Sequence, residues 1–349
     1  MQRPDLSSID PSIRKYIDYL EKRLGISAPT NPVEEYSPEK ASEPLPAEPE
    51  TTFNVITISK SGSLKRTYRH LYSRQHRSGM GVFDIDINPP DVPSALGVSD
   101  ESQTVLILTN RARVFRYSLR QVDPSPVHAR GIMAFERLAF ETDETVAAIL
   151  PEQARGYVAL LGETGKVRCL RHHLFGEHMR PGTTLFNVAE FGLLSAACWT
   201  PGDRELLIVS SQGMGIRFPE KSISPQGDIG IRLGSDDRAI GITSVDGDSQ
   251  VFLLGADGKG TIRQMSGFAA NKSAGGSGKI AIKTMRLVGA ASVRPDDDIF
   301  IITRLGKMIR FQADEIPPTD SAVQGVNCVS MRSDEVSAFI TSEKSNSIF

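Results

Sequence analysis

The densest run of chemically active side chains in this sequence is basic. Between residues 60 and 77 stand six lysines and arginines and two histidines with no acidic residue among them, namely Lys60, Lys65, Arg66, Arg69, His70, Arg74, His76 and Arg77. Clustered cations in a nearly neutral chain create a local positive field, and contacts with phosphates give affinity for nucleic acid that does not depend on base sequence. The segment predicts a contact with the phosphates of duplex DNA, with a solvated basic loop as the alternative.

Glycines follow this basic run directly, at Gly79 and Gly81. A residue without a side chain lets the backbone approach a phosphate closely, and successive backbone N–H groups can donate hydrogen bonds to it. The glycines therefore favour a phosphate contact around Arg77.

Metal and nucleophile chemistry is much less well supported. One local cluster holds metal-ligand types, namely Cys169, His172, His173, Glu177 and His178. Two histidines and a cysteine without a fourth ligand make a weak zinc site, so we expect a polar hairpin end and no metal. The three cysteines show no CxxC spacing and lie in separate parts of the chain, which argues against a disulfide framework. We expect no cofactor, because no glycine-rich phosphate loop precedes a helix, and no catalytic arrangement of Ser, His and Asp emerges from the spacing.

The elements that must position these side chains recur along the chain. Six runs of β-branched and apolar residues each pass through a turn and end on a basic residue, over residues 53–66, 104–116, 157–168, 205–217, 250–263 and 298–310. A repeat of roughly 45 to 53 residues is typical of a radial repeat fold. Each run predicts a hairpin around a turn glycine.

A second apolar run follows each hairpin and begins with a glycine in five copies, at Gly81, Gly131, Gly230, Gly278 and Gly325. An acidic turn then precedes another strand. Four strands in each of six units predict an all-β fold, a closed six-bladed propeller over residues 53–340, because radial repetition hides the edges of the sheets.

The arginines that end the six hairpins recur with the same period and are Arg66, Arg116, Arg168, Arg217, Arg263 and Arg310. They would follow a duplex bent around the rim if each lay at a similar radial position. Equally, each arginine could pair with a recurring acidic turn and hold adjacent blades together. Both interpretations stay open at the level of sequence.

The N-terminal part of the chain has a different composition. Residues 1–26 contain a predicted short helix, with one apolar face made by Ile13, Tyr16, Ile17, Leu20 and Leu24. This face predicts a docking or self-association helix, with a marginal helix against the body as the alternative. Residues 27–52 carry six prolines and six glutamates against one lysine, which predicts an extended tether, and residues 341–349 form a C-terminal tail.

Charge and hydropathy limit the class of protein to which this sequence can belong. The formal net charge is −2, and outside residues 1–50 the chain has 34 basic and 32 acidic residues. No apolar run approaches the length of a membrane helix, and residues 1–11 do not resemble a signal peptide. We therefore expect a cytoplasmic protein without membrane contact.

Particular motifs resemble the C-terminal domain of the A subunit of DNA gyrase and topoisomerase IV, a six-bladed β-pinwheel. The segment Gln75-His76-Arg77-Ser78-Gly79-Met80-Gly81 is similar to that family's QRRGGKG box and keeps Gln75, Arg77, Gly79 and Gly81. The segment from Thr109 to Arg116, which includes Arg113, resembles the second blade with alanine in place of the usual glycine. Motifs such as Gly215-Ile216-Arg217-Phe218 and Met308-Ile309-Arg310-Phe311 also resemble the family, and the similarity covers about residues 53–340.

The resemblance implies a DNA-wrapping domain without chemistry of its own. His76, Ser78 and Met80 replace an arginine, a glycine and a lysine of the box, which weakens the expectation of a full DNA wrap. The family's breakage-reunion tyrosine and its surroundings have no counterpart in the sequence, so we expect no strand cleavage, although the chain could be accessory to an ATP-dependent type II topoisomerase.

The sequence thus favours a non-catalytic protein that binds or bends duplex DNA on the outer blade edge. Its expected contacts are Lys60, Lys65, Arg66, Arg69, Arg74, Gln75, Arg77, Arg113, Arg116, Arg168, Arg217, Arg263 and Arg310. The main alternative is a protein-interaction scaffold in which DNA binding has decayed, and a weaker one is an enzyme that uses the central channel.

Overall fold

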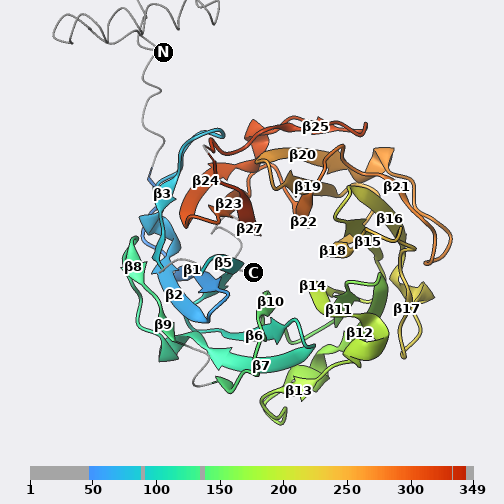
Figure 1. The fold of residues 1–349 in the computed structure, drawn as a ribbon, viewed down its shortest axis with the longest axis horizontal. Helices are drawn as coiled ribbons and strands as arrows, with labels where there is room; N and C mark the ends of the chain where they lie inside the picture. The colour runs from blue at the N-terminus through green and yellow to red at the C-terminus, as the bar shows by residue number, and fades with distance from the viewer. Residues whose placement is uncertain (1–46, 88–90, 134–137, 332, 343–349) are drawn as a thin grey trace, which may run out of the picture. The chain divides into compact units, whose positions relative to one another are not determined.

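A computed structural model describes residues 47–87, 91–133, 138–331 and 333–342. In this part of the chain six sheets stand as blades around a central axis, five of four strands and one with an additional strand (Figure 1). This arrangement confirms the predicted six-bladed propeller. The predicted N-terminal helix, most of the tether and the C-terminal tail lie outside the described residues.

The middle of every blade is an antiparallel hairpin, as the glycine turns predict. The six hairpins are β1 (Phe53–Ser59) with β2 (Ser63–Tyr68), β6 (Thr104–Thr109) with β7 (Arg113–Ser118), β11 (Tyr157–Gly162) with β12 (Lys166–Arg171), β15 (Glu205–Ser210) with β16 (Met214–Pro219), β19 (Gln250–Gly255) with β20 (Lys259–Gln264), and β23 (Asp298–Thr303) with β24 (Lys307–Gln312). The turn residue has positive φ in each hairpin, and in the second blade Ala112 adopts it, with φ of 57°.

The strand nearest the axis comes from the same repeat as the hairpin. These inner strands are β5 (Pro93–Asp100), β10 (Val146–Pro151), β14 (Leu194–Thr200), β18 (Ala239–Val245), β22 (Leu287–Val293) and β27 (Val336–Ser342). Each inner strand pairs with the first hairpin strand, and the pairing register shifts near the first residues of the inner strand.

The outermost strand of each blade is donated by the following repeat. These short strands are β9 (Ile132–Met133), β13 (Thr183–Thr184), β17 (Asp228–Ile229), β21 (Lys279–Ile280), β26 (Val326–Asn327) and β3 (Val82–Phe83), which complete blades 1 to 6 in that order. Blade 5 also receives β25 (Pro318–Thr319) in parallel. Because β3 belongs to the first repeat and pairs with β24 of the sixth, this exchange closes the ring.

Short connecting elements complete the repeats. A 3-10 turn follows each hairpin, at η1 (Arg69–Leu71), η2 (Leu119–Gln121), η3 (His172–Phe175), η4 (Glu220–Ser222), η5 (Met265–Gly267) and η6 (Ala313–Glu315). One helical turn, α3 (Val188–Phe191), precedes β14, and β4 (Ile85–Asp86) pairs in parallel with β8 (Ala129–Arg130).

The hydrophobic core is divided among the blade interfaces. Six clusters of buried apolar side chains each combine residues of two neighbouring blades, and the cluster between blades 6 and 1 joins Phe300 and Ile302 to Val55 and Tyr72. The hairpin strands are therefore apolar on both faces, which explains the near-continuous runs of Val, Ile and Leu in the sequence.

A glycine precedes each of the six antiparallel donated strands, and Gly81 shows the reason. A Cβ atom at Gly81 would lie 2.6 Å from the carbonyl oxygen of Met308 in β24, and φ of Gly81 is +69°. The incoming backbone thus approaches the neighbouring blade too closely for a side chain. Gly278 has the same role inside the ring, with φ of +75° and 2.5 Å to the carbonyl oxygen of Gly215.

A buried ion pair fixes the crossing segment that leads on from β3. Lys65 in β2 lies 2.5 Å from Asp84, and both side chains are fully buried. The hydroxyl groups of Thr57 and Tyr72 also donate to the Asp84 carboxylate. Burial lowers the pKa of Lys65, while its attraction to Asp84 opposes that shift. The segment that closes the ring is thereby held in blade 1 as well as in blade 6.

Replacing Gly81 by Ala should lower the free energy of unfolding by about 1–3 kcal/mol, because the new Cβ meets backbone at a strained φ. Gly278→Ala should cost a similar amount, and Gly234→Ala should be neutral because a Cβ atom there would meet no heavy atom within 4 Å. Thermal unfolding compares the three variants, and hydrogen exchange should show opening around β3 in Gly81→Ala alone. Equal melting of Gly81→Ala and Gly234→Ala would contradict the close approach of β3 to β24.

Replacing Asp84 by Ala should lower the free energy of unfolding by about 3–5 kcal/mol, because Lys65 would be left buried without a counterion. Asp86→Ala is the matched control two residues along, since Asp86 pairs with Arg130 at an exposed site and such pairs contribute about 0–1 kcal/mol. Denaturant titration measures both changes. Similar losses for the two variants would refute the structural role of the buried pair.

Candidate nucleic-acid interface

The basic segment of the first repeat lies largely inside the protein. Lys65, Arg66 and Arg69 are 1%, 4% and 1% exposed. Lys65 is held by Asp84, and Arg66 lies 3.9 Å from Glu101 with its guanidinium over the ring of Tyr68. These three side chains have almost no surface to offer to a phosphate, although Lys60 in the preceding turn is exposed.

Several of the predicted contacts meet in one network at the seam between blades 6 and 1. Asp298 binds Arg310 and lies 2.8 Å from Arg74, while Glu48 binds Arg69 and lies 2.6 Å from Arg310. All five side chains are at most 12% exposed. Their charges are therefore largely compensated by carboxylates within the fold.

Glu48 belongs to the predicted tether, yet it lies in this seam. Thr51 and Thr52 also bond to blade 1, through the backbone N–H of Thr51 to His70 and the hydroxyl of Thr52 to Asp100. The last residues of the predicted tether are thus docked on the propeller. Composition did not indicate this, because the docking depends on arginines contributed by distant strands.

The predicted box segment is part of the ring closure. The backbone N–H of Gln75 donates to Arg310 and that of Ser78 to Cys328, while Ser330 donates to Gly79. The Gln75 side chain accepts a hydrogen bond from the backbone of Gly81. Arg77 donates to the backbone carbonyls of Glu315, at 3.1 Å, and Asn327, at 3.2 Å, and remains partly exposed.

The six repeated arginines do not share one position. In four blades the arginine stands opposite the central residue of the paired hairpin strand, in the pairs Ile56 with Arg66, Leu106 with Arg116, Leu207 with Arg217, and Phe300 with Arg310. In blades 3 and 5 Cys169 and Ile262 occupy this position. Arg168 and Arg263 are one residue out of register, and because side chains alternate along a strand they face the opposite side of the sheet.

Two of the in-register arginines, Arg217 and Arg310, hold neighbouring blades together. Arg217 lies 2.5 Å from Glu205 and donates to the backbone carbonyls of Met265 and Phe268 in the next blade. Arg310 makes the equivalent bonds to the carbonyls of Arg69 and Tyr72. Their geometry supports the blade-pinning interpretation for these two residues.

The remaining predicted contacts are partly exposed or poorly paired. Arg113 lies 2.7 Å from Glu144, and Arg116 lies 2.7 Å from Glu152. Arg168 donates to the carbonyls of Leu185 and Pro225. Arg263 is 6% exposed, and its Nε and Nη1 lack a hydrogen-bond partner among the described residues. A DNA-contact role for all these residues stays a prediction.

A second periodic set of cations lies at the outer edge, and sequence reasoning missed all but one of its members. The first residue of the outer hairpin strand directly follows the turn residue and is Arg113, Lys166, Lys259 or Lys307 in blades 2, 3, 5 and 6. Each pairs with a donated outer strand and is partly exposed. Its signal in the sequence is the basic residue immediately after the turn glycine or Ala112.

Blades 1 and 4 carry their edge cations at other positions. Lys60 lies in the hairpin turn of blade 1, and Lys279 lies in β21 at the edge of blade 4. Partial burial lowers the pKa of Lys279, and the positive charges of Arg263 and Arg217 lower it further. We define the edge cations as Lys60, Arg113, Lys166, Lys259, Lys279 and Lys307, with one from each blade.

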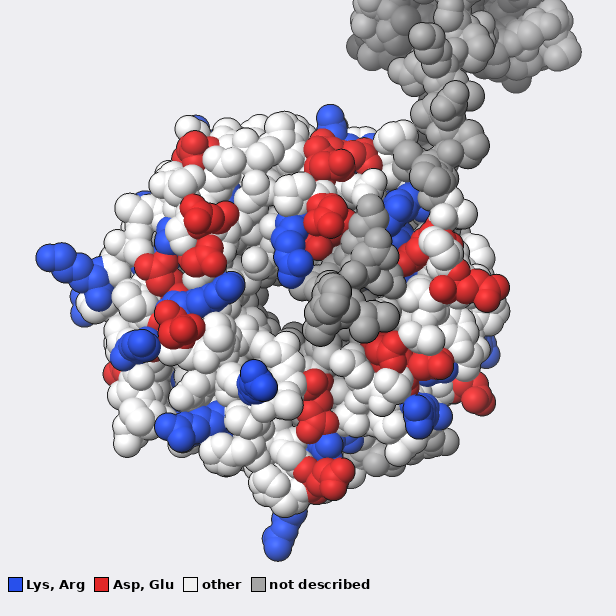
Figure 2. Space-filling model, turned by 180° about the vertical axis from the view of Figure 1, so that it is seen from behind, with Lys and Arg blue, Asp and Glu red and all other residues white. Residues whose placement is uncertain are grey.

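Apolar side chains are also exposed along this edge. The donated strands present Val82, Phe83, Ile132, Met133, Ile229 and Ile280, each between 38% and 52% exposed. On the face shown in Figure 2, lysines and arginines alternate with carboxylates around the central opening, and several cationic side chains project from the outer outline. The positive charge on this face is thus interrupted.

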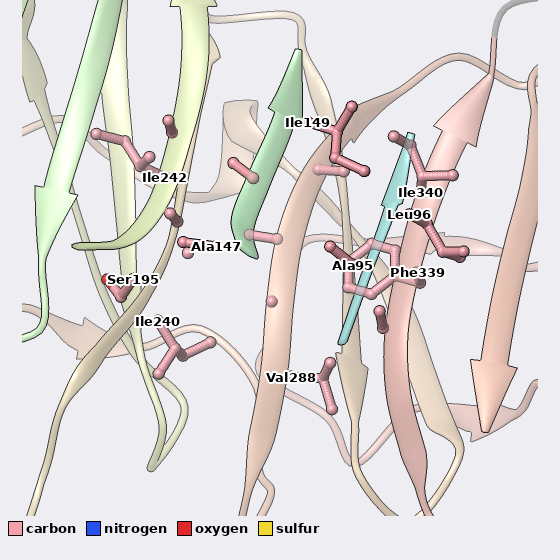
Figure 3. A pocket seen from close by; sticks show the side chains of 18 of the residues that line it. Ala95, Leu96, Ala147, Ile149, Ser195, Ile240, Ile242, Val288, Phe339 and Ile340 are labelled. Carbon is pink, nitrogen blue, oxygen red and sulfur yellow. The ribbon is translucent and has the colours of Figure 1, made fainter. Parts of the chain in front are cut away.

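The central channel is lined by the inner strands. Small and apolar side chains such as Ala95, Ala147, Ile242 and Val288 enclose a cavity of about 270 Å³ (Figure 3). Serines are its polar lining residues, and no titratable side chain is found among the described residues that form it. The lining thus lacks the convergent titratable groups that an enzyme in the channel would need.

The histidine and cysteine cluster does not converge. The rings of His172 and His173 are 5.9 Å apart in η3, while Cys169 faces the interface between blades 3 and 4. Burial raises the pKa of Cys169 to about 12. No group of three His, Cys, Asp or Glu side chains suited to a metal was found in the described parts of the chain. The described residues also include no helix long and apolar enough to cross a membrane.

A subunits of DNA gyrase are similar to this chain in sequence. The chain is 26% identical over 291 residues to the A subunit of DNA gyrase from Mycolicibacterium smegmatis, covering 79% of this chain and 34% of that protein. It is 24% identical to the A subunit of DNA gyrase from Mycoplasma pneumoniae, covering 80% and 35%. The chain therefore spans about a third of the length of these relatives.

Solved structures show the same fold at lower identity. A structure of the DNA gyrase A C-terminal domain matches with a TM-score of 0.73 and 18% identity over 83% of this chain and 100% of that one. The C-terminal domain of DNA topoisomerase IV matches with a TM-score of 0.60 and 17% identity, over 83% and 93%.

The family model described as "DNA gyrase C-terminal domain, beta-propeller" matches residues 54–92, 103–151, 204–246 and 297–340, which together make up half of the chain. The matched segments include hairpins of blades 1, 2, 4 and 6 and the crossing strand β3 that closes the ring. With its exchanged outer strands, its closing segment and its matching repeats, this chain belongs to the DNA gyrase C-terminal domain family of β-propellers.

Proposed function

We propose that the propeller binds duplex DNA along its outer edge through phosphate contacts, without reading base sequence and without chemistry of its own. The observation that carries the proposal is the set of edge cations, one from each blade, beside strands that follow one another around the perimeter. A curved polyanion could contact them in succession. Membership of a gyrase domain family supports the same function.

The strength of each contact depends on its neighbours. Lys259 and Lys307 have no carboxylate within ion-pair distance among the described residues, while Lys166 lies 2.8 Å from the exposed Glu190. Exposed ion pairs of this kind are weak, so a phosphate can compete with Glu190. Arg113 is held more firmly, because its partner Glu144 is fully buried. Among the four cations at the first position of the outer hairpin strands, the lysines of blades 5 and 6 are therefore the best phosphate ligands.

Base readout is not part of the proposal. Specific recognition uses a helix or a strand pair inserted into a groove, and the described elements of the outer edge are two-residue strands within the sheets. We infer that such a protein acts beside a DNA-handling partner, and an association with a type II topoisomerase core on another chain is the arrangement that the gyrase relatives favour.

A protein-interaction scaffold is the second candidate function. It is favoured by the exposed apolar side chains of the donated strands and by Met80, which is 67% exposed where the family box has a lysine. Apolar groups on an outer edge suit a protein partner better than a phosphate chain.

Reversing two edge charges separates these functions. Lys259→Glu with Lys307→Glu should weaken duplex binding at least about tenfold at low salt, because two phosphate contacts become repulsive. The slope of log K against log salt should become shallower by about 1.8, at about 0.9 for each contact. Arg155→Glu with Arg204→Glu is the control, since these cations lie in the turns before β11 and β15. Salt-insensitive or absent binding by the unaltered protein would instead favour the scaffold.

The basic segment of residues 60–77 requires a different design, because Arg74 is structural. Arg74→Glu should lower the free energy of unfolding by about 3 kcal/mol, since it places a second carboxylate beside the buried Asp298. Lys60→Glu should leave stability unchanged and weaken DNA binding. Thermal melting and mobility shifts, measured on both variants, test the assignment. A fully stable Arg74→Glu protein that has lost DNA binding would show that Arg74 contacts DNA directly.

A further inference from the structure

A groove of about 470 Å³ lies beside the outer end of blade 3. It is formed by β12, by η3 and by the chain that runs from η4 towards β17, and its lining includes Tyr157, Arg171, Leu174, Lys221 and Ile223. The volume falls in the range of small-molecule sites, which is about 300–1,000 Å³.

Blade 3 lacks a backbone hydrogen bond that covers the edge of the outer hairpin strand in three other blades. In blades 1, 4 and 6 the backbone carbonyl of the in-register arginine accepts a hydrogen bond from the chain crossing outside it, from Ser125, Asn271 and Gln75 respectively. In blade 3 the equivalent residue is Cys169. The crossing chain folds on itself instead, with the N–H of Ser224 donating to Asp228 at 2.6 Å and that of Gly227 donating to Ser224. The edge of β12 beyond Val167 therefore stays uncovered by β17.

Three cations lie along this uncovered edge. Arg168, Arg171 and Lys221 all line the groove, and none has a carboxylate within ion-pair distance in the described ranges of the chain. Arg168 is fixed in place by its bonds from Nε to the carbonyl of Pro225, at 3.1 Å, and from Nη1 to that of Leu185, at 2.9 Å. Arg171 and Lys221 are exposed and free to close on a ligand.

The single carboxylate of the lining does not neutralise them. Glu220 is 5% exposed, and its oxygens accept hydrogen bonds from the Thr200 hydroxyl and from the backbone N–H of Arg204. The groove therefore carries an excess of positive charge in a protein whose net charge is −2. An anion with more than one negative oxygen is the complementary ligand.

An apolar and aromatic wall stands beside the cations. The guanidinium of Arg171 lies 5.9 Å from the centre of the Tyr157 ring, and Leu174 is 44% exposed at the mouth of the groove. Tyr157 stands where Glu205 and Asp298 stand in blades 4 and 6, so a carboxylate that pairs with arginine elsewhere is replaced here by a ring. A flat ligand body can pack against such a wall while its phosphate meets the cations.

We propose that this groove binds a phosphorylated small molecule with a flat body, of the nucleotide class. Arg171 and Lys221 bind the phosphate, Arg168 adds positive charge at the strand edge, and Tyr157 with Leu174 contacts the body. We assign the groove a binding role only. The inference is independent of the edge cations, which exclude Arg168, Arg171 and Lys221.

Calorimetric titration of the full chain with ADP, adenosine and inorganic pyrophosphate tests the proposal. ADP should bind with a Kd below about 1 mM, pyrophosphate more weakly, and adenosine not at all. Arg171→Glu with Lys221→Glu should reduce ADP affinity at least about tenfold, and both residues are exposed, so the variant should keep the melting temperature of the unaltered protein. Lys272→Glu with Lys283→Glu is the charge-matched control and should bind ADP normally, because both residues are exposed and neither lines the groove.

Each outcome decides between nucleotide and DNA phosphate as the ligand. Lys259→Glu with Lys307→Glu should leave ADP binding unchanged, whether or not it alters DNA binding, so that failure of the DNA proposal is seen separately. Absence of ADP binding, or equal binding by the Arg171 and Lys221 variant, would overturn the proposal. The proposal would also be overturned if the unaltered protein bound no ADP and Arg171→Glu with Lys221→Glu lost duplex DNA binding. The groove would then belong to the DNA contact surface.

Discussion

The exchange of outer strands between repeats is the constraint on which the rest of this structure depends. No blade is complete in its own repeat, since the outer strands β9, β13, β17, β21 and β26 each come from the following repeat and β3 returns from the first repeat to blade 6. The seam between blades 6 and 1 must therefore hold without a covalent link. It does so with backbone hydrogen bonds from residues 75–79 and with a nearly buried network in which Arg310 contacts both Asp298 and Glu48. Such a network is destabilising unless every charge is paired, which restricts what these positions can hold.

The basic residues fall into two groups, one that stabilises the blade interfaces and one that lies at the perimeter. Arginines inside the blade interfaces, such as Arg217, use their planar, multidentate head to bind backbone carbonyls of the next blade and a carboxylate of their own. Lysines at the first position of the outer hairpin strands are partly exposed and carry a compact charge at the perimeter. The density of charge in a segment does not reveal which group a residue belongs to.

Blade 3 shows how a local change in the pattern creates new surface. Cys169 occupies the in-register position, Arg168 faces the opposite side of the sheet, and Tyr157 replaces the carboxylate seen in blades 4 and 6. The crossing chain has lost its bond to the strand edge, and the result is a positively charged groove with an aromatic wall. In a repeat protein each blade can diverge in this way because its neighbours maintain the ring.

The sequence by itself determined the number of blades, the hairpins and the family, because turn glycines and two-sided apolar runs are local features that recur with a fixed period. The glycine before each donated strand is also a feature of the sequence. In two repeats polar neighbours obscure it, so that the sequence indicated Gly230 in place of Gly227 and did not indicate Gly182. Only the tertiary structure decided which cations reach the surface. Lys65 and Lys60 are close together in the chain, yet one is buried against Asp84 and the other is exposed, because burial depends on a carboxylate brought in by a crossing segment. The one-residue shift of Arg168 was likewise invisible until cross-strand pairing fixed the register, and a shift of one residue turns a side chain to the other face of a sheet.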